Sequence, residues 1–337
     1  MSQKHTVGII GCGKRMGKHI PGILADERLE VVALSDVKEE AATAMNEEHD
    51  FGGSIYTDYK KMLTEIKPEV VVTCLWTPLH LPVFKGCAEA GVKAVLSEKP
   101  MAPTWGECKE MGRIAEETGC QLTFSHQRRF APGNLMVRKM LQEGIFGEIQ
   151  RMDLYSPPNL LDCGTHTFDQ AMSFNNESPA KWVLGAVDAS NPIKWFDVHA
   201  EAMAIGKIVF ENGVTAHFQV GGEDKSMGTG LRVHGTKGFI EVYWDGQIGC
   251  MAVYDKPGWR PEEPENPEDQ VMIDYVKNAI DCMESGDEPE LSHKKALRAA
   301  EIIFAIYESV RKRSRIELPI SIEDNAFISM LEAGEFK

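Results

Sequence analysis

The chain has 337 residues, of which 43% are hydrophobic and 26% charged, so its composition is that of a globular protein with one or two domains. Its formal net charge of −15 would repel a polyanion, which argues against nucleic acid as a partner. No apolar run approaches the roughly 20 residues that cross a bilayer, and no signal peptide is evident, so we expect a cytoplasmic protein that does not contact membranes. The eight cysteines form no C-x-x-C pair, which predicts neither disulfides nor structural zinc.

Up to about residue 125, apolar runs alternate with helical patterns. The runs at 6–10, 30–35, 69–74, 93–97 and 121–125 predict strands that are buried on both faces. Helical patterns at 58–67 and 80–91 fill two of the gaps between them. This alternation predicts an α/β domain over residues 1–124, built on a doubly wound parallel sheet.

A glycine-rich loop follows the first expected strand. Gly11, Gly13 and Gly17 have the spacing G-x-G-x-x-x-G, at a place where backbone amides can reach a pyrophosphate. We expect the loop to contact a dinucleotide through Gly11, Gly13, Lys14, Arg15 and Met16. The motif alone is weak, because glycine turns are common at strand ends.

Asp36 ends the second expected strand, 19 residues beyond Gly17, where a carboxylate can bind an adenosine ribose diol. This order predicts a Rossmann domain that prefers NAD to NADP. Asp36 could instead cap the helix that begins near Lys38, and both roles are compatible. Lys14 and Arg15 leave NADP open, because either could reach a 2′-phosphate.

Charged side chains recur at the carboxyl ends of later strands. Glu98, Lys99 and Pro100 end the run at 93–97, and the proline restrains Lys99 to an extended backbone. Arg128 and Arg129 follow the run at 121–125, where a guanidinium could contact substrate or form a structural ion pair. We carry Arg129 as the substrate-binding candidate.

Asp162 and His166 lie four positions apart at the start of an expected helix over 165–174. They are candidates for an acid-base pair, but Asp162 or Thr165 could also simply cap that helix. Metal binding is a third alternative, since His199, Glu201, His217 and His234 follow, but without a closed ligand spacing. We expect no metal.

After residue 148 the apolar period changes to two. Residues 207–220 alternate around an Asn212-Gly213 turn, and further glycine turns follow up to residue 254. The proline-rich acidic stretch at 259–270 predicts a loop, and 294–313 predicts a long helix. Residues 125–337 therefore read as an α+β domain on an open, mainly antiparallel sheet.

Six stretches together identify a family. They are "GIIGCG" (8–13), "EKPMA" (98–102), "HQRRFAPG" (126–133), "GEI" (147–149), "DCGTHTFD" (162–169) and "HGTKGFIEV" (234–242). With these the chain resembles the glucose-fructose oxidoreductase, inositol dehydrogenase and MocA family over nearly its whole length.

The resemblance implies that the nicotinamide lies between the two domains and that the open sheet supports a homo-oligomer, a dimer or tetramer. It also implies that Lys99, Asp162 and His166 line the substrate pocket. Relatives often have a cis bond at the lysine-proline step. Many also have a T-P-N run where this chain has Leu75-Trp76-Thr77 before His80.

We accordingly expect cofactor contacts from Leu75, Trp76, His80, Glu98 and Lys99 as well. Trp76 is either a wall of the pocket or a core residue.

The resulting prediction is an NAD-dependent oxidoreductase that acts on a secondary hydroxyl of a sugar, cyclitol or glycoside. His166 would be the general acid/base, Lys99 would polarise the reacting oxygen, and Asp162 would orient the imidazole or bind a second hydroxyl. One alternative keeps NAD bound and uses transient oxidation for epimerisation or glycoside elimination. Another is a non-catalytic nucleotide-sensing protein.

Overall fold

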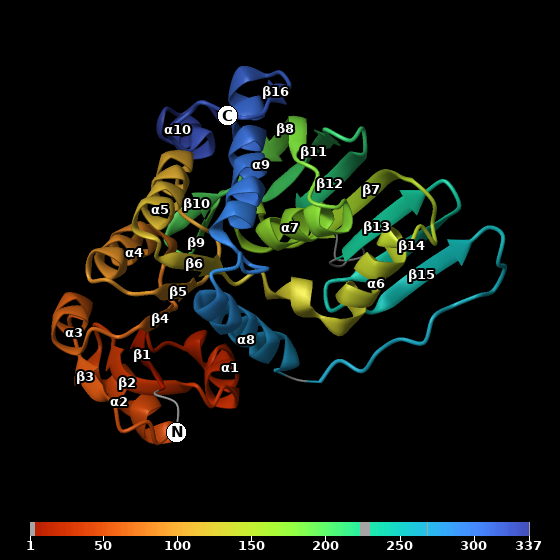
Figure 1. Cartoon of the computed structure of the whole chain (residues 1–337). Helices are drawn as coiled ribbons and strands as arrows, with labels where there is room; N and C mark the ends of the chain where they lie inside the picture. The colour runs from red at the N-terminus through yellow and green to blue at the C-terminus, as the bar shows by residue number, and fades with distance from the viewer. Residues whose placement is uncertain (1–3, 223–229, 268, 337) are drawn as a thin grey trace. The chain divides into compact units, whose positions relative to one another are not determined.

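The computed structural model describes residues 4–222, 230–267 and 269–336 (Figure 1). They form two compact units, neither of them continuous in sequence. The first unit comprises described residues within Met1–Ala102, Glu107–Gln127 and Pro267–Ala296, and the second comprises those within Pro103–Gly106, Arg128–Asn266 and Leu297–Lys337. A boundary between residues 124 and 125 remains a prediction about the two domains.

The first unit is built on a parallel sheet, as the sequence predicts, and the sheet has one strand more than the five predicted. Its strands are β1 (His5–Ile10), β2 (Leu29–Ser35), β3 (Ser54–Tyr56), β4 (Val70–Thr73), β5 (Ala94–Ser97) and β6 (Gln121–Phe124). The strand order is β3-β2-β1-β4-β5-β6. The order of strands therefore reverses at the parallel neighbours β1 and β4, with β2 and β3 on one side and β5 and β6 on the other. Ligands of such sheets bind beyond the carboxyl ends of the strands at this switch point.

Helices complete the first unit. They are η1 (Met16–Lys18), α1 (Ile20–Ala25), α2 (Glu39–Glu48), α3 (Tyr59–Ile66), η2 (Thr77–Leu79), α4 (His80–Glu89), α5 (Trp105–Thr118) and α8 (Gln270–Ser285). The late helix α8 packs directly on α1, where a Cβ on Gly22 would lie only 2.5 Å from the Met272 carbonyl oxygen. Helix α8, which comes more than 140 residues after β6, thus belongs to the first unit and packs on its first α-helix.

The second unit is built on an eight-stranded sheet of order β15-β14-β13-β7-β12-β11-β8-β16. These strands are β7 (Ile149–Ser156), β8 (Ala180–Asp188), β11 (Met203–Phe210), β12 (Thr215–Gly221), β13 (Gly230–Gly235), β14 (Gly238–Tyr243), β15 (Ile248–Val253) and β16 (Ile316–Glu317). All described pairings are antiparallel except that of β7 with β12. The predicted turn joins β11 to β12, with Gly213 at a φ of 86°.

Helices cover one face of this sheet. The second unit contains η3 (Gln127–Phe130), α6 (Pro132–Gln142), the π-helix η4 (Leu160–Gly164), α7 (Thr165–Phe174), α9 (His293–Lys312) and α10 (Ala326–Glu332), with a small ribbon of β9 (Ile193–Trp195) and β10 (Val198–Ala200). Phe168 of α7 meets Phe218 of β12 edge-to-face, with ring centroids 5.4 Å apart. Among the described helices, none is both long and apolar enough to cross a membrane.

Candidate active site

The glycine loop has the conformation that its first glycine predicts. Gly11 has a φ of 88°, and a Cβ there would lie 2.2 Å from the Cys74 carbonyl oxygen, so no other residue fits. Space is open at Gly13 and Gly17, where an added Cβ would meet nothing within 4 Å. Lys14 is exposed, whereas the Met16 side chain is buried under the loop. The loop therefore offers backbone at the switch point.

Asp36 joins the end of β2 to this loop. Its Oδ2 accepts a hydrogen bond from the Cys12 N–H at 2.8 Å, and its Oδ1 accepts one from the Lys38 N–H at 2.9 Å. The second bond forms a local turn just before α2, whose N-cap is Lys38 without a capping side chain, so Asp36 does not cap that helix. A carboxylate has about four acceptor sites, so these two bonds leave room for a diol.

Arg15 and His19 both approach the carboxylate of Glu98. Glu98 Oε1 lies 2.6 Å from Arg15 Nε and 2.7 Å from His19 Nε2. Burial alone would raise the pKa of Glu98, but the hydrogen bond from His19 and the charges of His19, Arg15 and Lys99 outweigh it and lower that pKa to about 2. Glu98 is therefore a buried anion that ties the glycine loop to the end of β5. His19 is a partner that the sequence did not suggest.

His80 holds the turn that follows Glu98. Its Nδ1 lies 2.9 Å from the Pro100 carbonyl oxygen and its Nε2 lies 3.2 Å from that of Leu75, and burial lowers its pKa. The Lys99–Pro100 peptide bond is cis, and Lys99 is buried. His80 therefore links the ends of β4 and β5.

Trp76 lies between β4 and η2, next to Leu75, whose carbonyl oxygen His80 contacts. The Trp76 side chain is 63% exposed, which rules out the core alternative for this residue.

Asp162 and His166 lie in a buried segment where a π-helix passes directly into an α-helix. Asn159 caps it: its Oδ1 accepts the Asp162 N–H at 2.8 Å. The capping side chain is thus neither Asp162 nor Thr165, and α7 begins at Thr165 after Gly164. Asp162 and His166 are both buried, with 8% and 4% of their surface exposed. Such π-helical turns are rare and concentrate at functional sites.

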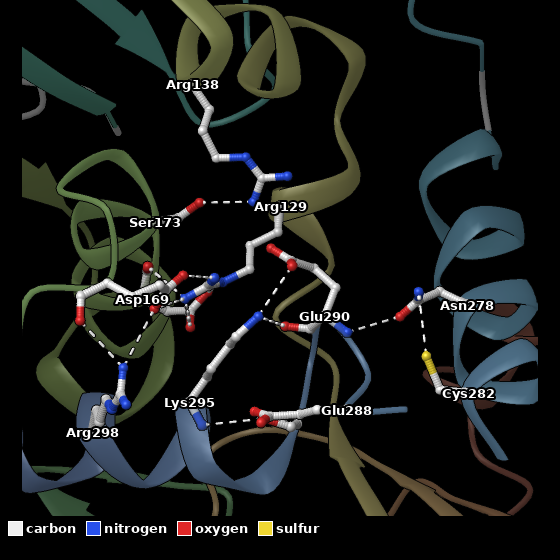
Figure 2. A network of polar contacts seen from close by, with 12 residues as sticks. Arg129, Arg138, Asp169, Ser173, Asn278, Cys282, Glu288, Glu290, Lys295 and Arg298 are labelled. Atoms are coloured by element: carbon white, nitrogen blue, oxygen red, sulfur yellow. Dashed lines mark hydrogen bonds and ion pairs between the residues drawn. The ribbon is translucent and has the colours of Figure 1, made fainter. Parts of the chain in front are cut away.

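Arg129 forms a buried ion-pair network (Figure 2). Its guanidinium donates to both carboxylate oxygens of Asp169, at 2.7 Å and 2.9 Å, and also pairs with Glu177. Burial alone would lower the pKa of Arg129, but the two carboxylates raise it. This network fastens η3 to α7, so the geometry favours a structural role over the expected substrate contact.

Arg128, unlike Arg129, contacts Trp244 and Cys163. Its guanidinium carbon lies 4.7 Å from the ring centroid of Trp244, and Nη2 lies 3.8 Å from Cys163 Sγ, next to Asp162. The Asn134 amide donates to the carbonyl oxygens of Arg128 and Trp244, which fixes the β14–β15 turn beside η3. Sequence reasoning missed Trp244, although its place beside an Asp-Gly turn predicts an exposed aromatic ring.

One group of described residues has the composition of a metal site. His19, Cys74 and Glu98 place ligand atoms within 4.8 Å of one another. Glu98 already accepts from His19 and Arg15, however, and burial raises the pKa of the Cys74 thiol well above its usual range. An added cation would also face Arg15 and Lys99. We propose no metal here.

Comparison with known proteins identifies the family. Residues 5–126 match the NAD-binding Rossmann domain of the Gfo/Idh/MocA oxidoreductase family. Residues 150–318 match the C-terminal alpha/beta domain of the same family. The chain belongs to this oxidoreductase family. The resemblance and the enzyme class expected from the sequence, an NAD(P)-dependent oxidoreductase, are confirmed.

Several named relatives act on carbohydrates or cyclitols. A 1,5-anhydro-D-fructose reductase of Ensifer adhaerens is 28% identical, over 74% of this chain and 77% of the relative. The scyllo-inositol 2-dehydrogenase (NADP(+)) IolW of Bacillus subtilis (strain 168) is 26% identical, over 77% of this chain and 75% of the relative. A levoglucosan dehydrogenase in complex with NADH has the same fold, with a TM-score of 0.83 at 19% identity, covering 95% of this chain and 100% of that one.

The predicted residues fall into two sets. Those of the glycine loop, Asp36, the Leu75–His80 turn and the Glu98–Lys99 turn belong to the first unit, where hydrogen bonds join Cys12 to Asp36 and Arg15 to Glu98. Asp162, His166 and Arg129 belong to the second unit.

Proposed function

We propose that this oxidoreductase uses NAD to oxidise a secondary hydroxyl of a sugar, cyclitol or glycoside, or reduces the corresponding ketone. The observation that carries the proposal is the buried, capped segment that holds Asp162 and His166 one helical turn apart. Oxidation of a carbinol needs a base for the hydroxyl proton and a group that steadies the developing alkoxide. His166 would take the proton, Lys99 would polarise the oxygen, and Asp162 would orient the imidazole or bind a second hydroxyl. The cofactor, when bound, accepts the hydride.

NAD is the proposed cofactor rather than NADP. The Asp36 carboxylate, held at the glycine loop by the Cys12 N–H, is suited to a ribose diol and would repel a 2′-phosphate. Arg15, one of the two cations that could favour NADP, has its Nε bonded to Glu98, whereas the other, Lys14, is exposed. The name of IolW includes NADP(+), and the levoglucosan dehydrogenase structure is a complex with NADH.

A carbohydrate or polyol is the proposed substrate class, since the relatives described above are named for sugars and an inositol. We add Arg128 and Trp244 as substrate-side residues and give Arg129 a structural role. Trp244 is 54% exposed and lies on Arg128, which reaches Cys163 beside Asp162. An exposed indole next to a proposed sugar site can pack against the apolar face of a pyranose ring.

The test is a panel of sugars, glycosides and cyclitols with NAD, in which reduced nicotinamide is followed by absorbance and products by mass spectrometry. Reduced nicotinamide that accumulates in proportion to oxidised product supports the proposal. Product without net reduction supports the alternative that uses bound NAD for epimerisation or elimination. NAD binding without any turnover across the panel favours a non-catalytic nucleotide-binding protein.

A further inference from the structure

Glu201 is a completely buried carboxylic acid that has no part in the chemistry proposed above. It lies in the short link between β10 and β11. Its Oε1 accepts a hydrogen bond from the Leu160 N–H at 2.7 Å, and its Oε2 lies 2.5 Å from the Tyr307 hydroxyl oxygen. A carboxyl group is costly to bury unless both oxygens find partners, so these two bonds are what keep it inside.

The Leu160 bond falls at the beginning of the segment that carries the proposed acid-base pair. Leu160 is the first residue of η4, and the first N–H groups of a helix have no acceptor within the helix. Two side chains supply acceptors here: Asn159 for the Asp162 N–H and Glu201 for the Leu160 N–H. Glu201 therefore fixes the point from which η4 and α7 start.

Tyr307 fixes Glu201 in turn. It comes from α9 and is fully buried, and its ring packs on Phe304 and Phe327 with centroid distances of 6.4 Å and 5.4 Å. The hydroxyl is thus aimed by aromatic packing as well as by its hydrogen bond. One carboxyl group joins three separate elements of the second unit: the β10–β11 link, the π-helix and α9.

We propose that Glu201 is a positioning residue, which holds Asp162 and His166 in place through the Leu160 amide while Tyr307 fixes its carboxyl group. The structural part of this inference stands by itself. Its kinetic consequence rests on the proposed function, in which a small displacement of a general base is costly to the rate.

Leu160 and Tyr307 both donate to the carboxyl group of Glu201. Burial raises the pKa of Glu201 to about 7, although the hydrogen bonds from Tyr307 and from the amides of Leu160 and Glu201 itself lower it. Tyr307 is the titratable group that faces it, and none of the influences on this pKa among the described residues is a charged side chain. Oε1 accepts from the Leu160 N–H and Oε2 accepts from the Tyr307 hydroxyl. In Glu201→Gln the amide Oε1 can still accept from Leu160, while Nε2 donates to the Tyr307 oxygen, so both links remain although the second bond runs in the opposite direction.

The test compares Glu201→Ala, Glu201→Gln and Tyr307→Phe by hydrogen–deuterium exchange of the intact chain without substrate. We expect Glu201→Ala to speed exchange in the peptide 159–174, Tyr307→Phe to do so less strongly, and Glu201→Gln to restore the parent exchange rate.

In turnover, Glu201→Ala should lower kcat about tenfold or more with NADH affinity unchanged, and Glu201→Gln should recover most of the lost kcat. The control is Phe146→Leu, which removes buried packing beside Gly235 and Gly238 at the β13–β14 turn, away from the contacts described for Glu201 and Tyr307. It should lower Tm and leave the 159–174 peptide unchanged.

Two results would overturn the inference: unchanged exchange in Glu201→Ala, or exchange in Glu201→Gln that is as fast as in Glu201→Ala. Exchange needs no substrate, so it decides the role of Glu201 even if the sugar and cyclitol panel gives no turnover.

Discussion

The carboxylate of Asp36 accepts a hydrogen bond from the Cys12 N–H at 2.8 Å, so the end of β2 and the glycine loop after β1 form one connected unit. The two parts of the dinucleotide motif, read separately from the sequence, meet directly in the structure. Asp36 is therefore fixed in position at the loop before any cofactor arrives.

We predict that the parent protein binds NAD more tightly than NADP, and that Asp36→Ser reverses or removes this preference. The change takes away both the acceptor for the ribose diol and the repulsion of a 2′-phosphate, which should weaken NAD binding by about tenfold. Calorimetric titration with both cofactors measures it. Asp58→Ser is the matched control, because Asp58 caps α3 with the same local hydrogen bond, to the Lys60 N–H, at a distance of 2.8 Å. Equal or tighter binding of NADP by the parent would contradict the assignment.

We predict that His166→Ala folds and binds NAD but loses turnover by a factor on the order of 10² to 10⁴, the usual contribution of a positioned general base. Lys99→Ala should also impair chemistry more than cofactor affinity, and Asp162→Asn should do less. The comparison is Asn159→Ala, which removes the cap of η4 and should cost about 1 kcal/mol of unfolding free energy. Near-normal turnover by His166→Ala, on a substrate that the parent oxidises, would leave this segment as a helix start only.

We predict that Arg129→Met lowers the free energy of unfolding by about 3–5 kcal/mol, because it leaves the carboxylate of Asp169 buried without its partner. Urea denaturation measures the loss, and adding Asp169→Asn should recover part of it. Lys139→Ala breaks a surface ion pair with Glu143 and should cost at most about 1 kcal/mol. A variant at Arg129 with parent stability but a raised KM would instead support the substrate contact expected from the sequence.

We predict that Glu98 stabilises the fold as an anion. Its pKa of about 2 in the folded chain lies below the ordinary value, so this stabilisation is complete above the ordinary pKa and is lost as the pH falls towards about 2. Glu98→Gln should therefore reduce the unfolding free energy at neutral pH by on the order of 3 kcal/mol, with the gap to the parent narrowing below about pH 4.5. Urea titrations at a series of pH values test this, and a gap independent of pH would exclude the charge as the cause.

We predict a homo-oligomer that forms through the open face of the eight-stranded sheet. Ile306 of α9 packs on the covered face at Gly185, whereas Leu184 and Ile205 on the other face are 46% and 44% exposed. A sheet face with exposed apolar side chains gains by pairing with a second copy. Light scattering at micromolar concentrations should show a dimer or tetramer, which Leu184→Glu with Ile205→Glu should dissociate. Leu24→Glu, on the exposed surface of α1, is the control and should leave the assembly intact. A monomeric parent would exclude this interface.

The sequence by itself determined the alternation of strands and helices in the first unit, the glycine loop, Asp36 and the Asn212-Gly213 hairpin. These features depend on local periodicity and on residues whose backbone preferences are strong, so they can be read along the chain. The short edge strand β3 escaped notice, because three partly exposed residues carry no clear pattern.

Only the tertiary structure decided which polar groups meet. Arg128 and Arg129 are adjacent in sequence, yet one lies on Trp244 and the other is buried against Asp169. Glu201 and Tyr307 are 106 positions apart and share one hydrogen bond. A buried charge or carboxyl group must find its partner in three dimensions, and no local spacing records which partner it finds.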